Sequence, residues 1–279
     1  MNARDLLPPA LLAAMRRVKA RSGKKKYASY SEALTTCSKD GYENREVVEV
    51  VTQKTLCYRN DLKRAAFPAS INATNAYSLV ALLLSVSQAK SINVLDFGGA
   101  AGAHYFLARS ILPESTELNW VVVETPAMAQ RAGVLLGNRE LRFSADLKEA
   151  RRWLGQVDLL HTSGTLQCVP DPYEQFQQLV NIQAQYMLLN RLGLTRGDYD
   201  VITIHKSQLS WNGPGPLPAG MRDREISYPF TFPRESIIKA MLCESHTEIA
   251  EFDDASGIFP VGAEPIIGMG LLAARKGNR

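Results

Sequence analysis

Apolar and polar positions change in regular blocks between residues 91 and 190. Short apolar runs, each long enough for one buried strand, alternate with stretches whose apolar residues fall at helical spacing. Such alternation implies right-handed βαβ units and a parallel sheet. The runs predict strands at 91–97, 118–124, 140–143, 157–161 and 184–190. The stretches between them predict helices at 103–112, from Pro126 onward, up to about Leu154, and at 171–182.

The chain before this block has a helical pattern. Ser29 and Ser31 are suited to cap a first short helix, and residues 75–87 form a strongly apolar helical run. We therefore predict a helical region over residues 27–90. Such a region would either cover the site or form a dimer face, so a homodimer stays open.

After Arg191 the alternation stops. Residues 195–232 are rich in glycine, proline and aromatic residues, and only 200–207 has a strand-like pattern. We expect this segment to be an insertion that covers the substrate, because long loops in compact domains are often functional. An ordinary structural hairpin with core aromatics is the alternative.

The C-terminal part of the chain returns to regular elements, with a helix at 233–244 and strands at 245–252 and 265–275 that can pair as an antiparallel edge. Residues 91–279 together predict an α/β fold, a Rossmann-like doubly wound sheet of about seven strands.

Composition supports a compact protein. Of 279 residues, 46% are hydrophobic and 22% are charged, which excludes a disordered chain and a coiled coil. No apolar run reaches the roughly 18 residues that a membrane span needs. The four cysteines show no CxxC spacing, so we expect reduced thiols in a cytoplasmic protein, with neither a disulfide framework nor a bound metal.

The net charge of +4 is unevenly distributed. Residues 1–26 hold eight basic residues and one acidic residue, a net charge of +7, so the remainder carries −3. We expect 1–26 to be a mobile basic arm, with attachment to an anionic membrane surface as the alternative. It does not have the order of a secretory signal, because its charges follow the apolar stretch.

A glycine-rich loop is the most informative motif. The sequence Asp96-Phe-Gly98-Gly99-Ala-Ala-Gly102 follows a predicted strand and precedes a predicted helix, where glycines permit a tight turn and a close approach to a ligand. A dinucleotide site has the spacing GxGxxG and places a pyrophosphate there. The leading carboxylate of Asp96 would repel a pyrophosphate, and it suits an ammonium or sulfonium group. S-adenosylmethionine carries both.

Two further acids follow the next two predicted strands. Glu124 ends the second strand, beside the glycine loop in a parallel sheet, where it can accept both ribose hydroxyls. Asp146 follows the third strand and can accept the adenine amino group, while Leu147 packs on the ring. Solvated loop acids are the alternative for either residue taken alone.

These motifs resemble those of a known family. Residues 92–172 are similar to class I S-adenosylmethionine-dependent methyltransferases: DFGGAAG resembles the first motif, VVVE the second, ADL the third, and HTSGTLQCVPDP the segment after the fourth strand. More narrowly, the chain from about Tyr27 to Leu272 resembles a poorly characterised methyltransferase-like group with LDFGG, a Trp before VVE, and SGTLQ. The resemblance implies a small-molecule or sugar acceptor, of natural-product or surface-polysaccharide type.

Methyl transfer is an in-line displacement, and an oxygen or nitrogen nucleophile often needs a base. The candidate bases are His205, His161 and His104, of which we favour His205 or His161. The candidate cofactor-binding residues are Asp96, Gly98, Gly99, Gly102, Tyr105, Glu124, Thr125, Asp146, Leu147, Thr162 and Ser163. The candidate substrate-binding residues are Gln167, Arg191, Trp211 and Tyr228.

Two other classes of function remain open. A nicotinamide-dependent Rossmann oxidoreductase is one, although Asp96 ahead of the glycines argues against it. A non-catalytic methyltransferase-like binding protein is the other, although the glycine loop is intact. A nucleic-acid partner is not expected, because Asp171-Pro172-Tyr173 is too short and too far along the chain to match the motif of DNA amino-methylating enzymes.

Overall fold

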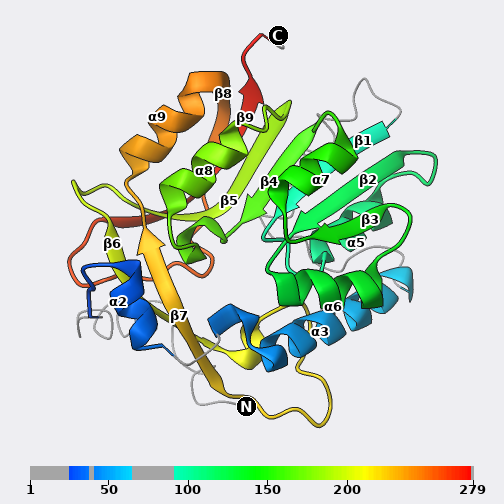
Figure 1. The fold of residues 1–279 in the computed structure, drawn as a ribbon, viewed down its shortest axis with the longest axis horizontal. Helices are drawn as coiled ribbons and strands as arrows, with labels where there is room; N and C mark the ends of the chain where they lie inside the picture. Colours follow the sequence, from blue (N-terminus) through cyan, green and yellow to red (C-terminus); the bar gives the residue numbers. More distant parts are fainter. Residues whose placement is uncertain (1–24, 38–40, 65–90, 278–279) are drawn as a thin grey trace, which may run out of the picture.

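The computed structural model describes residues 25–37, 41–64 and 91–277 (Figure 1). Most of the basic arm and the apolar run 75–87 lie outside the described residues. No helix in the described ranges is both long enough and apolar enough to cross a membrane.

A seven-stranded sheet forms the centre of the fold, in the order β3-β2-β1-β4-β5-β9-β8. Strands β1 to β5 are parallel, and β9 pairs antiparallel with both β5 and β8. This confirms the predicted α/β class and the antiparallel edge. The strands are β1 (Ser91–Phe97), β2 (Glu117–Val123), β3 (Leu141–Ser144), β4 (Leu159–Ser163), β5 (Tyr186–Thr195), β8 (His246–Asp253) and β9 (Ile266–Arg275).

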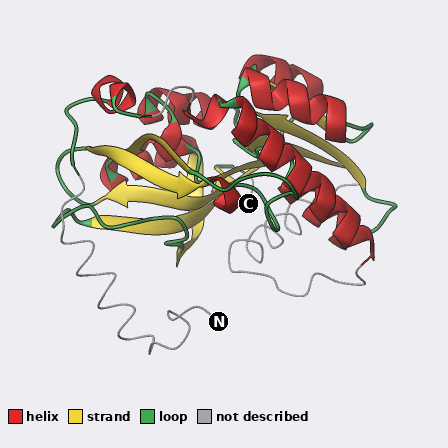
Figure 2. Cartoon of the chain, turned by 90° about the horizontal axis from the view of Figure 1, so that it is seen from below, coloured by secondary structure: helices red, strands yellow, loops and turns green. Residues whose placement is uncertain are grey.

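Helices cover both faces of the sheet, as expected for parallel strands that are apolar on both sides (Figure 2). Successive residues of β1 show this: Val94 packs in one hydrophobic core and Leu95 in the other. The first core includes residues of α3 (Arg45–Arg64), α5 (Ala103–Ile111) and α6 (Pro126–Leu136). The second includes residues of α7 (Leu147–Leu154), α8 (Pro172–Val180) and α9 (Glu235–Ser245).

Local sequence signals explain where several helices begin. Asp146 caps α7, because its side chain accepts hydrogen bonds from two backbone N–H groups of the first turn, and Asp171 caps α8 in the same way. Proline occupies the first position of α6 and of α8, where no intrahelical N–H is needed.

The segment after β5 forms a separate two-stranded antiparallel sheet, β6 (Val201–Gln208) with β7 (Glu225–Phe232), joined through the short helix η4 (Leu209–Trp211). The sequence pattern predicted β6 but not β7. Phe230 and Phe232 of β7 are almost fully buried, so these aromatics serve the core of the hairpin.

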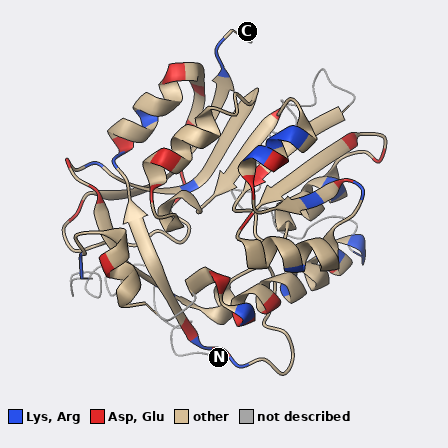
Figure 3. Cartoon of the chain, viewed as in Figure 1, with Lys and Arg blue, Asp and Glu red and all other residues tan. Residues whose placement is uncertain are grey.

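The N-terminal helix α2 (Tyr30–Thr35) and the short helices η2 (Gly41–Glu43) and η3 (Leu166–Cys168) complete the described elements. Figure 1 shows α2, α3 and β7 arranged beyond the carboxyl ends of β1 to β4. Basic and acidic residues occur on helices and loops of both the sheet and these outer elements (Figure 3). The carboxyl ends of the parallel strands are therefore where the sheet, the hairpin and the N-terminal helices come together.

Candidate functional site

The glycine loop makes a tight connection between β1 and α5. Gly98 and Gly102 have φ angles of +70° and +80°, and the Gly98 N–H donates to the Val123 carbonyl oxygen. A Cβ atom at Gly99 would lie 2.3 Å from a carboxylate oxygen of Asp96. Glycine is therefore required at position 99 so that the loop can close over the Asp96 carboxylate.

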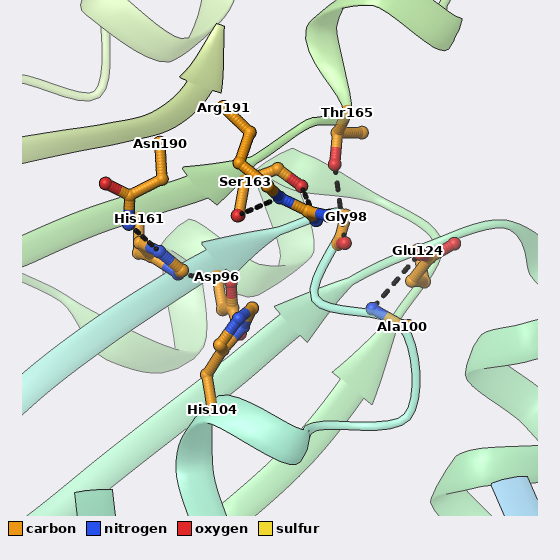
Figure 4. Close-up of polar contacts among 10 residues, drawn as sticks. All are labelled: Asp96, Gly98, Ala100, His104, Glu124, His161, Ser163, Thr165, Asn190 and Arg191. Carbon is orange, nitrogen blue, oxygen red and sulfur yellow. Dashed lines mark hydrogen bonds and ion pairs between the residues drawn. The ribbon is translucent and has the colours of Figure 1, made fainter. Parts of the chain in front are cut away.

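Asp96 has two histidine partners beneath this loop (Figure 4). Its Oδ1 lies 2.9 Å from Nδ1 of His161, and its Oδ2 lies 3.2 Å from Nδ1 of His104. On the far side of His161, Nε2 lies 3.1 Å from the side-chain nitrogen of Asn190. The four side chains form one connected row, Asn190–His161–Asp96–His104.

Strand register explains part of this row. Asp96 of β1 is paired directly with His161 of β4, and paired residues of neighbouring strands project to the same face of a sheet. His161 is paired in turn with Leu188 of β5, and Asn190 lies two residues further along that strand, on the same face. His104 enters from the first turn of α5.

Burial and charge set the protonation of this row. Burial alone would raise the pKa of Asp96, but the charges and hydrogen bonds of His104 and His161 outweigh it and hold that pKa well below its usual range. Burial lowers the pKa of His161, whose side chain is 2% exposed. Asp96 is therefore ionised and His161 neutral at pH 7, and any cation bound at Asp96 has to share its oxygens with two imidazoles.

Glu124 follows β2 and faces the glycine loop. Its two carboxylate oxygens accept hydrogen bonds from the backbone N–H groups of Ala100, at 3.1 Å, and of Thr125, at 2.8 Å. Loss of surrounding water raises the pKa of Glu124 to about 7, an effect that these two N–H groups reduce and the charge of Asp96 increases. The carboxyl group is thus held in place before any ligand binds.

Two buried hydroxyls lie near the carboxyl ends of β2 and β4. The side-chain oxygens of Thr125, after Glu124, and Thr162, in β4, have no hydrogen-bond partner within the described ranges. A buried hydroxyl without a partner is unfavourable unless a ligand or a water molecule forms the missing hydrogen bond.

The third predicted acid lies after β3. Asp146 uses Oδ1 to cap α7, at 2.6 Å from the Lys148 N–H, and the partly buried Leu147 packs against the second core. Tyr105 is placed differently. It is 4% exposed, donates from its hydroxyl to Glu140 and packs in the first core, so the structure does not bring it to the strand ends.

Arg191 lies within β5, at the register irregularity between Leu189 and Leu192, in a left-handed conformation with φ of +52°. Its guanidinium donates to the side-chain oxygen of Ser163 at 2.9 Å and to the Ser163 carbonyl oxygen at 2.8 Å. Its backbone N–H donates to Asp254, and its carbonyl oxygen accepts from the side chain of Gln167 at 2.7 Å. Gln167, expected at the substrate, is 1% exposed and holds the backbone of Arg191.

The remaining candidates lie on the hairpin. His205 is paired with Tyr228 and stacks on Phe259 with ring centroids 5.0 Å apart, so it sits in the aromatic cluster of the hairpin and on a different sheet from Asp96. Trp211 of η4 is 72% exposed.

Tyr42 and Thr165 are site residues that sequence reasoning missed. Tyr42 of η2 packs edge-to-face on Tyr228, and burial together with the charge of Glu124 raises its pKa. Thr165 lies against Gly98, where a Cβ atom would approach its hydroxyl to 2.0 Å. Neither residue belongs to a recognisable motif or a periodic pattern, so the sequence carries no signal for them.

Comparisons with known proteins give a structural likeness alone. No protein-family model matches the chain, and no curated protein sequence matches it. It is similar to the structure of an S-adenosylmethionine-dependent methyltransferase from Clostridium acetobutylicum, with 11% identity, a TM-score of 0.47, and coverage of 81% of this chain and 99% of that chain.

Two further similar structures are methyltransferases by description. One is CalS10, an amino pentose methyltransferase from Micromonospora echinaspora, with 14% identity, a TM-score of 0.43, and coverage of 74% of this chain and 92% of that chain. The other is the N-methyltransferase NodS from Bradyrhizobium japonicum in complex with S-adenosylhomocysteine, with 15% identity, a TM-score of 0.42, and coverage of 78% and 98%. Because these identities and TM-scores are low, the likeness adds nothing to the class of fold that the strand order already defines.

The class of fold follows from the strand order itself. Five parallel strands lie in the order β3-β2-β1-β4-β5, and the antiparallel strand β9 lies between β5 and β8. This is the Rossmann-like sheet that the resemblance to class I methyltransferases implies.

Proposed function

We propose that the chain is an S-adenosylmethionine-dependent methyltransferase that acts on a small molecule or a sugar. The main observation that supports this proposal is the order of the candidate ligand-binding groups along one edge of the sheet. Asp146 follows β3, Glu124 follows β2 and the glycine loop follows β1, and these three strands are neighbours. This order fits an elongated ligand with adenine, ribose and amino-acid parts lying across the strand ends.

Glu124 is the best-prepared of these groups. Two backbone N–H groups already orient its carboxylate, so little conformational freedom is lost when it accepts the two ribose hydroxyls. The unpartnered hydroxyl of Thr125 lies next to it and offers a further contact.

S-adenosylmethionine supplies the electrophilic methyl group when it is bound. The chain has to orient the acceptor in line with that methyl and keep water away. The carboxyl end of β4, which carries Ser163, lies next to β1 on the side away from β2 and Glu124. Arg191 of the following strand, β5, contacts Ser163, so we assign the acceptor to that side.

Of the three candidate histidines, the geometry favours His104 for direct contact with a bound ligand. Its side chain is 25% exposed and lies two residues after Gly102. Both ring nitrogens of His161 already have protein partners, and His205 belongs to the aromatic cluster of the hairpin. We therefore propose that His161 acts through Asp96 as a positioning residue.

Arg191 suits an acceptor that carries a carboxylate or a phosphate. In the part of the chain that the structure describes, no carboxylate forms an ion pair with its guanidinium, which is held by the neutral oxygens of Ser163. A guanidinium held in this way is prepared to bind an anionic group.

Calorimetric titration with S-adenosylmethionine and S-adenosylhomocysteine tests this function. We expect saturable binding of both, weakened about tenfold or more in Glu124→Gln, because the amide has only one oxygen for two hydroxyls and two N–H groups. Glu117→Gln, at the exposed other end of β2, is the matched control and leaves both affinities unchanged. Absence of binding of either ligand at millimolar concentration, or binding of a nicotinamide dinucleotide instead, contradicts the proposal.

A further inference from the structure

The row of side chains beneath the glycine loop also contains a set of potential metal ligands. One carboxylate oxygen of Asp96 and one ring nitrogen each of His104 and His161 all lie within 4.8 Å of one another. They come from three elements, namely the end of β1, the first turn of α5 and strand β4. Two imidazoles with one carboxylate form a ligand set that divalent transition metals favour. We propose that Asp96, His104 and His161 bind one such ion, with Zn²⁺ and Co²⁺ as suitable probes.

The separation of each histidine from Asp96 is that of neighbouring ligands around one ion, and each histidine faces a different carboxylate oxygen. Nδ1 of His161 lies 2.9 Å from Asp96 Oδ1, and Nδ1 of His104 lies 3.2 Å from Asp96 Oδ2. Two ligand atoms, each about 2.1 Å from a metal and separated by an ordinary coordination angle, stand about 3.0–3.4 Å apart. The two rings meet edge-to-face with centroids 4.6 Å apart, so both present nitrogens to the same carboxylate (Figure 4).

Burial gives the cluster an inner side and an open side. The side chains of Asp96 and His161 are 0% and 2% exposed, whereas that of His104 is 25% exposed. Three protein ligands would leave one position of a four-coordinate ion for water or a small ligand, as in catalytic rather than structural metal centres.

The negative charge of Asp96 also favours a bound cation. Among the described residues, Asp96 forms ion pairs with these two histidines alone. The buried carboxylate of Asp96 is an anionic ligand. A divalent ion bound there would replace its two hydrogen bonds to the histidines by coordination bonds to Asp96, His104 and His161.

The proton balance can be met without net proton release. A neutral imidazole that ligates through Nδ1 keeps its single proton on Nε2. For His161 this places an N–H 3.1 Å from the Asn190 amide, which accepts it once the amide turns to present its oxygen. Such an outer partner is characteristic of metal-bound histidines. Water can accept the corresponding proton of the partly exposed His104.

Titration of the tag-free, cofactor-free chain with CoCl₂, followed by visible absorption and by competition with ZnCl₂, tests the site. We expect one Co²⁺ per chain, with ligand-field bands and without the charge-transfer band of a cysteine thiolate. His104→Ala removes a partly exposed ligand and should weaken binding about 100-fold or more. His205→Phe, which removes a histidine outside the cluster and keeps its stacking on Phe259, should bind as the wild type does.

Asp96→Asn keeps the shape of the carboxylate and removes its charge, so it should weaken Co²⁺ binding about tenfold or more. Circular-dichroism melting checks that each variant is folded. The inference is overturned if the wild type shows no saturable Co²⁺ or Zn²⁺ binding up to about 1 mM, or if folded His104→Ala binds as tightly as the wild type. Because these titrations contain no cofactor, their outcome is independent of whether S-adenosylhomocysteine binds.

Discussion

Glu124 changes its charge near neutral pH, because its pKa is raised to about 7. Ribose hydroxyls donate hydrogen bonds, so the ionised carboxylate is the form that accepts both of them. If the ionised form alone binds, affinity for S-adenosylhomocysteine falls as pH drops through 7, by about tenfold between pH 8 and pH 6. Calorimetry across this range measures the fall.

Glu124→Gln separates this residue from every other source of pH dependence. The amide does not titrate, so the variant should bind weakly and with nearly constant affinity from pH 8 to pH 6. A wild-type affinity that is flat over the same range, or a variant that follows the same slope, assigns the pH dependence to another group.

Gly99 illustrates how closely the loop fits the acid beneath it. In Gly99→Ala the new Cβ atom would lie 2.3 Å from Asp96 Oδ2, and either the loop or the carboxylate has to move. We expect a loss of about 1–3 kcal/mol in the free energy of unfolding, measured by urea denaturation.

Gly133→Ala is the matched comparison within the same domain. Gly133 lies inside α6, and a Cβ atom there has Phe143 as its nearest neighbour at an ordinary 3.9 Å. Alanine is the better helix former, so this variant should gain about 0.5–1 kcal/mol. Equal effects of the two substitutions would show that the contact with Asp96 does not decide the outcome.

At the scale of elements, Asp146 has two separable tasks. Its Oδ1 caps α7, and the proposed function adds a contact with the adenine amino group. Asp146→Ser keeps a good cap with a shorter reach, so stability should change by less than about 0.5 kcal/mol while affinity for S-adenosylhomocysteine falls several-fold. Thermal melting and calorimetry on the same preparation measure both effects.

Asp171→Ala provides the reverse case. It removes the cap of α8, a helix that begins after β4, and should cost about 1 kcal/mol without changing the affinity. Unchanged binding in Asp146→Ser would remove Asp146 from the cofactor site and leave it as a helix cap.

The elements themselves were readable from the sequence where one period dominates. The strands of the parallel sheet are short apolar runs bounded by acids or glycines, and each was located to within a few residues. Strand β7 was missed because Tyr228, Pro229 and Phe230 break the expected alternation, and its pairing with β6 is what makes it a strand.

The candidate site was only partly readable. The glycine loop and Glu124 could be predicted from the sequence, because they end strands and belong to a motif. The partnership of Asp96 with His161 depends on the register between β1 and β4, strands separated by more than sixty residues of sequence. Nothing local encodes that register, and so the sequence suggested that Asp96 was free for a ligand and that His161 or His205 was the base.

At the scale of the molecule, groups from distant parts of the chain meet at one edge of the sheet. Tyr42 of η2 packs on Tyr228 of the hairpin, and Tyr30 of α2 donates a hydrogen bond to the Cys168 carbonyl oxygen just after β4. The N-terminal helices and the hairpin therefore lie over the carboxyl ends of the strands (Figure 1). This placement fits the proposal that residues 195–232 cover the substrate.

Net charge is unevenly distributed along the chain, since the first 26 residues carry +7 and the remainder −3. Within the described part, Lys26 pairs with Glu264 and the Lys25 carbonyl oxygen accepts from Thr203, so these two residues belong to the folded body. Deletion of residues 1–24 should therefore abolish salt-dependent retention on heparin, because polyanion binding depends on the basic cluster. Affinity for S-adenosylhomocysteine should change less than about twofold, because every group assigned to the cofactor lies beyond residue 95. A tenfold loss of that affinity on deletion, measured by calorimetry with intact folding, would instead place the basic segment at the cofactor site.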